Sequence, residues 1–118
     1  MQNIKEKIYE AVKNVTDNVT DQYPKNWAEL PAVQYSEEDN RVNRWADNKE
    51  QDSYVRYRFD IWDDTSTSKT ACVLDEKVSA LGLKRIQCTD QDDNSGYKHK
   101  IMRYEGIINP RNERVTHL

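Results

Sequence analysis

Glycine, cysteine and long apolar runs are scarce in this sequence, and each scarcity excludes a class of function. The chain of 118 residues contains only three glycines, too few for either type of phosphate-cradling loop. Cys72 and Cys88 are its only cysteines, so we expect reduced, partly buried thiols and neither a disulfide framework nor a zinc site. Residues 1–15 lack the apolar core of a secretory signal, and no later segment approaches the roughly 18 apolar residues of a membrane-spanning helix. The sequence therefore predicts a soluble, intracellular protein with no membrane partner.

Apolar residues are also fewer than in an ordinary globular domain. They make up 36% of the chain, whereas 33% of its residues are charged, so we expect one small core and many side chains that face water or a partner. The 18 basic and 21 acidic side chains give a net charge of −3, so the protein as a whole has no basic surface for a polyanion. We therefore expect no specific nucleic acid partner.

Candidate catalytic and metal-binding groups lack the partners that their chemistry requires. His99 lies between two lysines in an expected strand, where we interpret it as a solvated side chain, and His117 belongs to the polar C-terminal segment. The turn at 90–96 spaces its acidic residues like a calcium loop, but its glycine comes one position late and Ile101 occupies the place of the bidentate glutamate. The sequence predicts no enzymatic activity, no metal and no cofactor.

Two apolar stripes with a helical period predict two helices. The first stripe runs through the N-terminal segment and comprises Ile4, Ile8, Ala11, Val12, Val15 and Val19. The second follows a segment rich in Thr and Ser and comprises Ala71, Leu74, Val78 and Leu81, with Gly82 expected in the left-handed conformation after the helix. We expect both helices to cover the same face of a sheet.

The clearest strand is Tyr54–Trp62, in which β-branched and aromatic residues follow a two-residue period. A short strand at Ala32–Tyr35 is expected before it, and Lys84–Thr89 and Tyr97–Ile108 are expected to form an antiparallel hairpin after the second helix. We predict an α+β fold with a mostly antiparallel sheet of about four strands and two helices packed on one face, in the order α-β-β-α-β-β.

A densely charged stretch at about residues 36–52 contains neither glycine nor proline. A long structureless connection is improbable inside a compact domain, so we predict a projecting, charged arm on a single domain of residues 1–108. Residues 109–118 are polar and show no period, so we predict a flexible C-terminal tail.

The strand Tyr54–Trp62 has two different sides, and Val55, Tyr57, Phe59 and Ile61 are expected to face the core. The opposite side combines Tyr, Trp and Arg, which are enriched in protein–protein hot spots, so we interpret it as an assembly surface. The alternative is a solvated sheet face with cross-strand ion pairs. The predicted contact residues are Arg41, Arg44, Trp45, Asp47 and Lys49 in the arm and Tyr54, Arg56, Arg58, Asp60 and Trp62 on the strand.

The order of these segments resembles that of the tail-completion, or tail-terminator, proteins of long-tailed bacteriophages and their prophages. The resemblance covers about residues 4 to 108, and no single piece of it is a catalytic signature. It is carried by the short N-terminal helix, "QYPKNWAELPAVQY", "RWADNKEQ", "YVRYRFDIWDDTSTS", "VSALGLKR" and "YKHKIMRYEGII".

The resemblance implies a structural virion assembly protein without a cofactor or a reaction. Such proteins are small α+β subunits that close into rings, usually hexameric, which terminate the tail tube and join it to the head connector. The implied partners are sister copies, the major tail protein and head-connector proteins. The implied location is the cytoplasm of the bacterial host during assembly and then the virion.

A small nucleic-acid-binding or regulatory adaptor, encoded by the same kind of phage element, is the alternative function. An adaptor of this kind would be a monomer that binds oligonucleotides tightly and with a strong salt dependence. A ring protein would instead form multimers that depend on its concentration. A fluorescence anisotropy titration and a light-scattering mass distinguish the two.

Overall fold

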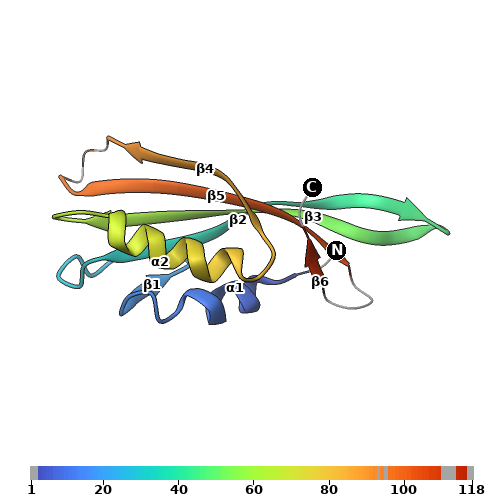
Figure 1. The fold of residues 1–118 in the computed structure, drawn as a ribbon, viewed down its shortest axis with the longest axis horizontal. Helices are drawn as coiled ribbons and strands as arrows, with labels where there is room; N and C mark the ends of the chain where they lie inside the picture. Colours follow the sequence, from blue (N-terminus) through green and yellow to red (C-terminus); the bar gives the residue numbers. More distant parts are fainter. Residues whose placement is uncertain (1–2, 93, 95, 110–113, 117–118) are drawn as a thin grey trace.

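A computed structural model describes residues 3–92, 94, 96–109 and 114–116. The elements of this described part, drawn in Figure 1, are α1 (Lys5–Val12), β1 (Asn18–Thr20), β2 (Ala32–Ala46), β3 (Lys49–Asp63), α2 (Ser68–Ser79), β4 (Lys84–Gln91), β5 (Lys98–Asn109) and β6 (Arg114–Thr116). The strands form one sheet in the order β1-β2-β3-β5-β4, and β6 also pairs with β5. Only the β1–β2 pairing is parallel among these strands.

The predicted α+β class with a mostly antiparallel sheet is confirmed, but the prediction of about four strands is wrong. Two three-residue strands, β1 and β6, were not expected. A segment this short is too brief for a two-residue period to be recognised. One of them, Arg114–Thr116, falls in the segment predicted as a flexible tail and pairs with Ile107–Asn109 of β5. Most other residues of that tail lie outside the described part.

The first helix is shorter than its apolar stripe predicts. It ends at Val12, with Lys13 as its C-cap, and Val19 lies in β1 beside Val33 of β2. Residues 15–20 are rich in Val and Thr, whose branched side chains favour strand over helix. The free edge of β2 offers these residues backbone hydrogen bonds. They therefore form a strand, although the helical spacing of apolar residues continues to Val19.

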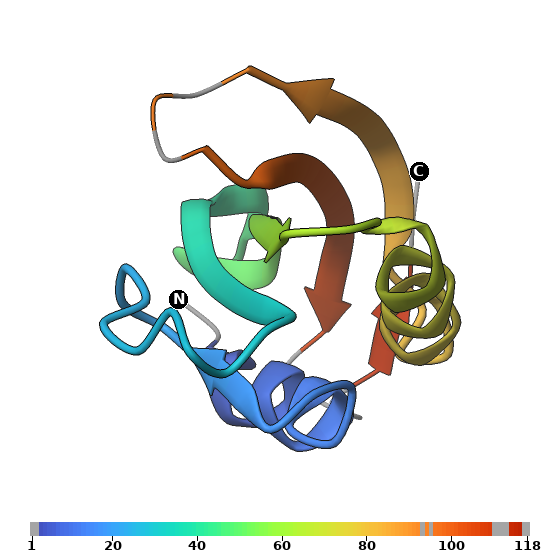
Figure 2. The same cartoon turned by 90° about the vertical axis from the view of Figure 1, so that its left-hand side faces the viewer.

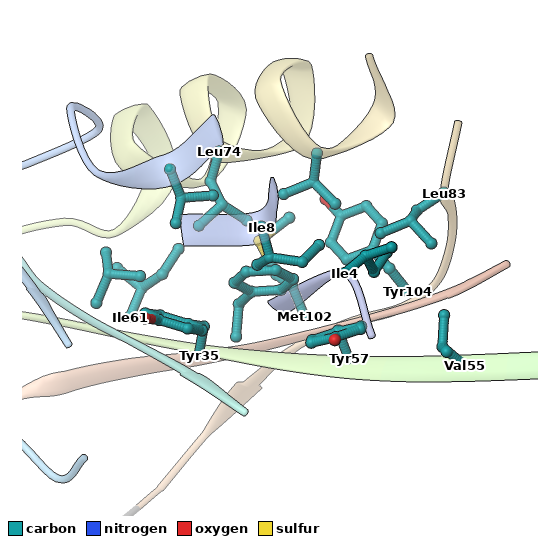
Figure 3. Close-up of a cluster of buried hydrophobic side chains, with 14 of the residues drawn as sticks. Ile4, Ile8, Tyr35, Val55, Tyr57, Ile61, Leu74, Leu83, Met102 and Tyr104 are labelled. Atoms are coloured by element: carbon teal, nitrogen blue, oxygen red, sulfur yellow. The ribbon is translucent and has the colours of Figure 1, made fainter. Parts of the chain in front are cut away.

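Both helices lie on the same side of the sheet, as predicted, and Figure 2 shows this arrangement. The core between helices and sheet is formed by Ile4, Ile8, Val12, Val33, Tyr35, Val55, Tyr57, Phe59, Ile61, Ala71, Leu74, Val78, Leu83, Met102, Tyr104 and Ile108, many of which Figure 3 shows in close-up. Val55, Tyr57, Phe59 and Ile61 of β3 are fully buried, which confirms the side of the strand that was predicted to face the core.

Polar contacts fasten α2 to the sheet. The Tyr104 hydroxyl of β5 donates a hydrogen bond to the Asp75 carboxylate at 2.6 Å, and the Arg85 guanidinium of β4 lies 3.1 Å from the same carboxylate. Burial, and then the hydrogen bond with Asp75, raises the pKa of Tyr104. After the helix, Gly82 has a φ of 96°, so the predicted left-handed conformation is present.

The β2–β3 pair is a long hairpin closed by a two-residue turn. Asp47 and Asn48 have φ values of 52° and 62°, the left-handed values that a type I′ hairpin turn requires. The pairing of β3 with β5 starts only at Ser53, so residues 43–52 form a ribbon of two strands, which we call the hairpin extension. Figure 1 shows this extension beyond the ends of both helices, and the whole chain measures 51 × 24 × 22 Å.

Candidate functional site

The outer face of β3, which lies opposite the core, is partly covered by the chain itself. Tyr54, Asp60 and Trp62 are buried, with Trp62 only 3% exposed, whereas Arg56 and Arg58 are partly exposed. These five residues were predicted to contact another molecule. In the isolated chain, therefore, only the two arginines of this set offer much surface to a partner.

An aromatic cluster covers Trp62 at one end of this face. The ring of Trp62 lies 5.5 Å from Tyr23 and 5.6 Å from Trp27, and it stacks on the imidazole of His99 at 4.5 Å. Trp27 also stacks on Tyr97 at 4.8 Å, with ring planes only 8° apart. The loop between β1 and β2 is thus held against the sheet by its two aromatic side chains.

A buried carboxylate organises the polar groups beside the cluster. The Asp60 carboxylate accepts two hydrogen bonds from the Arg58 guanidinium, at 2.7 and 2.8 Å, and lies 2.7 Å from Nε2 of His99. The hydrogen bond with Asp60 raises the pKa of Arg58. The interpretation of His99 as a solvated side chain without a carboxylate partner is therefore wrong.

The position of His99 follows from the pairing of β3 with β5. In that register His99 lies opposite Trp62, and Asp60 is the next residue of β3 on the same face. The contacts of Asp60 with Arg58 and His99, together with the stack of His99 on Trp62, fix this group of side chains. The contact between Asp60 and His99 could have been predicted by assuming that β3 and β5 are neighbours, because the two-residue period of each strand already gave the side on which each residue lies.

Cross-strand pairs occupy the middle of the outer face. Arg103 of β5 donates a hydrogen bond to Glu38 of β2 at 2.9 Å, and Arg56 Nε lies 3.3 Å from the same oxygen, although its N–H is not aimed at it. The Tyr54 hydroxyl donates to Glu105 at 2.8 Å. These contacts favour the alternative interpretation of this region as a sheet face with cross-strand ion pairs.

The hairpin extension brings the other predicted contact residues together. Trp45 is 59% exposed, and Val42 at the base of the extension is 47% exposed. Arg44 lies 3.5 Å from the Asp52 carboxylate, which also accepts a hydrogen bond from Asn43 at 2.8 Å. The extension is thus held by its own polar contacts, while its one large apolar side chain, Trp45, faces solvent.

The remaining arm residues lie at the base and the tip of this ribbon. The Arg41 guanidinium lies over the Tyr54 ring, 4.4 Å from its centre, which is the geometry of a cation–π contact. Asp47 is in the turn, and Lys49 starts β3 as an exposed residue. An exposed tryptophan beside arginine and lysine, on strands with open edges, is suited to docking on another protein.

Three further observations limit the chemistry of the described residues. No three His, Cys, Asp or Glu side chains gather in that part of the chain to hold a metal ion. Cys72 and Cys88 are free but exposed, so the prediction of partly buried thiols is wrong. Neither α1 nor α2, the helices that the structure describes, has the length and apolar character needed to cross a bilayer.

Comparisons with known proteins add no relative from which a function could be transferred. No family model matches the sequence, and no curated protein is similar enough to count as related. The function must therefore be argued from the geometry above.

Proposed function

We propose that this protein is a structural subunit of a long-tailed bacteriophage or prophage, where copies form a ring that terminates the tail tube and joins it to the head connector. The hairpin extension is the observation that supports this proposal most directly. It places an exposed Trp45 and the charged groups of Arg44 and Lys49 on a ribbon outside the body of the subunit. Such a feature adds nothing to the core and suits contact with another chain.

A ring needs a head-to-tail contact, in which one patch of a subunit meets a different patch of the next. The extension supplies the first patch, because it reaches beyond both helices (Figure 1). Its tryptophan and arginine are residue types that often dominate the free energy of such contacts. We propose a hexameric ring, with the major tail protein and head-connector proteins as its other partners, first in the host cytoplasm and then in the virion.

The nucleic-acid-binding adaptor is less well supported. A basic platform would need arginines that are free to meet phosphates. Arg56, Arg58 and Arg103 are instead held by the carboxylates of Glu38 and Asp60 on their own sheet. The net charge of −3 disfavours a polyanion further.

Substitution in the hairpin extension tests the ring. We expect Arg44→Glu combined with Trp45→Ala to shift the sedimentation distribution toward monomer across a concentration series, because both side chains are lost from the proposed contact. Circular dichroism should show a folded monomer, since neither residue belongs to the core. Lys77→Glu on the exposed surface of α2 is the matched control, which reverses one charge and should leave assembly unchanged.

Two results would contradict the proposal. Assembly of the double variant at wild-type concentrations would show that the extension is not a subunit contact. A wild-type chain that stays monomeric in light scattering, yet binds an oligonucleotide tightly in fluorescence anisotropy and loses that binding at high salt, would favour the adaptor.

A further inference from the structure

The sheet has two long free edges, one on β2 and one on β4. The short strand β1 pairs only with Ala32–Gln34 of β2, so the outer edge of β2 from Tyr35 to Ala46 has no partner strand among the described residues. Strand β4 ends the strand order, and the described part places no strand beside its outer edge either. Such edges have unpaired backbone groups and are where a second chain can add.

The first charged residues of the two edges have opposite sign. The free edge of β2 starts with the acidic run Glu37, Glu38 and Asp39, whereas β4 starts with Lys84 and Arg85. Glu38 is already engaged by Arg103 and Arg56, Asp39 lies 3.4 Å from Arg41, and Arg85 lies 3.1 Å from Asp75. The last two pairs are partly exposed to water and are therefore weak, so Asp39 and Arg85 can also meet charges on a second chain. Asp39 and Lys84 face the outer side of the sheet, because they align with Arg56 and Glu105 in the strand register.

The strand register also places these charges at the same level along the strands. Arg56 of β3 pairs with Asp39 on one side and with Glu105 on the other, and Glu105 pairs with Lys84. One residue further along β3, the same chain of pairs connects Glu37, Tyr57, Tyr104 and Arg85. Asp39 and Lys84 thus belong to one row across the sheet, and Glu37 and Arg85 to the next.

In a ring, residues that share a row within one copy come to lie opposite each other at the junction between two copies. Copies in a closed ring are related by rotation without translation along the ring axis. With strands parallel to that axis, the β4 edge of one copy therefore meets the β2 edge of the next at the same level. Three successive antiparallel pairings make β4 run opposite to β2, so the two edges meet in the antiparallel sense.

An unsatisfied buried group lies in one of the matched rows. Oε1 of Glu37 and the hydroxyl of Tyr57 are both buried close to each other, and neither atom makes a hydrogen bond of good geometry. Burial, and then the nearby charge of Glu37 and a weak hydrogen bond with it, raises the pKa of Tyr57. Leaving a buried acceptor unpaired is costly, and a donor that arrives from a second chain would remove the cost.

We propose that, in the ring put forward above, the acidic run Glu37–Asp39 of one copy binds the basic start of β4 in the next copy. Lys84 then faces Asp39 on the outer side, and Arg85 faces Glu37 on the helix side. This contact rests on the proposed function and adds a pair of strand edges to the contact made by the hairpin extension.

Side chains dominate this contact, because both edges are irregular. The ladder of β2 is interrupted between Glu37 and Asp39, and that of β4 between Arg85 and Gln87. Bulges of this kind protect an edge against indiscriminate strand pairing. Moreover, β1 occupies the β2 edge as far as Gln34 and limits the contact to a few residues. Association should therefore weaken as salt screens the charges.

Reciprocal charge swaps test the contact. We expect Asp39→Lys alone and Lys84→Asp alone each to raise the concentration for half-assembly roughly tenfold, because like charges then lie opposite each other at every junction. An equimolar mixture of the two variants should assemble as the wild type does, since each altered edge now meets an edge of opposite charge. A chain with both substitutions should also assemble. Light-scattering mass over a concentration series measures all four samples.

The controls separate loss of this contact from loss of the ring or of the fold. Glu76→Lys reverses an exposed charge on α2 and should leave assembly unchanged, and circular dichroism checks the fold of every variant. If the wild type assembles and the single swaps do so equally well, or if mixing and the double swap fail to restore assembly, this contact is overturned while the ring stands. A wild type that remains monomeric at every concentration overturns both.

Discussion

The two halves of the β2–β3 hairpin belong to the same pair of strands and have opposite fates. Near the helices, Val55, Tyr57 and Phe59 of β3 are completely buried beneath α1 and α2. In the hairpin extension, Trp45 leaves more than half of its surface to water. Two differences coincide: only the first half has a covering layer of helices, and only the first half carries the alternating aromatic and branched residues that such a layer can bury.

This contrast separates, within one pair of strands, the part that stabilises the fold from the part that we propose contacts other copies. Burial of large apolar side chains is the main source of folding free energy, and it is concentrated in the half under the helices. The extension depends on its turn and a few polar contacts, such as that between Asn43 and Asp52. Substitutions in the first half should unfold the protein, whereas substitutions in the second should change only what it binds.

The largest effect is expected in the buried half. Phe59→Ala should lower the free energy of unfolding by about 3–5 kcal/mol, because it removes a fully buried ring and leaves a cavity beside Tyr104. Urea denaturation followed by circular dichroism measures the change. A loss below about 1 kcal/mol would mean that the helices do not bury this half of the hairpin, and it would contradict the contrast with the hairpin extension.

A smaller effect is expected from one hydroxyl at the edge of the core. Tyr104→Phe should cost about 1.5 kcal/mol of unfolding free energy, because the hydroxyl donates to the charged Asp75. Tyr57→Phe is the matched control, and it should change stability by less than about 0.5 kcal/mol, since its hydroxyl makes no hydrogen bond of good geometry. Equal losses in the two variants would refute the distinction.

The same tyrosines predict how stability depends on alkaline pH. Their pKa values are raised in the folded protein above the ordinary value of 10.0. Above about pH 10, unfolded chains lose these protons while folded chains keep them, so the free energy of unfolding should fall as the pH rises further. Below that pH the contribution is fully present. Denaturation at a series of alkaline pH values should show a shallower fall for Tyr104→Phe than for the wild type.

The smallest effect on stability is expected in the extension. Trp45→Ala should change the unfolding free energy of the monomer by less than about 0.5 kcal/mol, because the side chain is mainly in water. Thermal and urea unfolding at a concentration that keeps the chain monomeric measure it. A loss comparable with that of Phe59→Ala would show that the extension belongs to the folding core.

Much of the fold was predictable wherever one strand or helix carried its own pattern. The alternation in Tyr54–Trp62 predicted correctly which of its side chains face the core, and the stripe around Leu74 predicted α2. The start of α1 was also predictable, but its end was not. The helix ends early because the following residues pair with the edge of β2, and this pairing cannot be seen in residues 4–19 alone.

The outer face was harder to predict because it depends on which strands are neighbours. The contact between Asp60 and His99 connects residues that lie 39 positions apart. The burial of Trp62 depends on a loop whose aromatic side chains fold back over it. The sequence marked this face as rich in Tyr, Trp and Arg, but composition alone does not distinguish a surface that awaits a partner from one that the chain covers itself.

The irregularities in β2 have a consequence for which substitutions this chain can accept. The β2–β3 ladder changes register between Glu37 and Asp39, between Val42 and Arg44, and between Arg44 and Trp45. Each change interrupts the strict in-and-out alternation that a regular strand imposes. Substitutions at the tip therefore need not follow the alternation of apolar and polar residues that packing against the core requires. The residues at the tip can therefore change to suit a different neighbour without any change in the packing of the core.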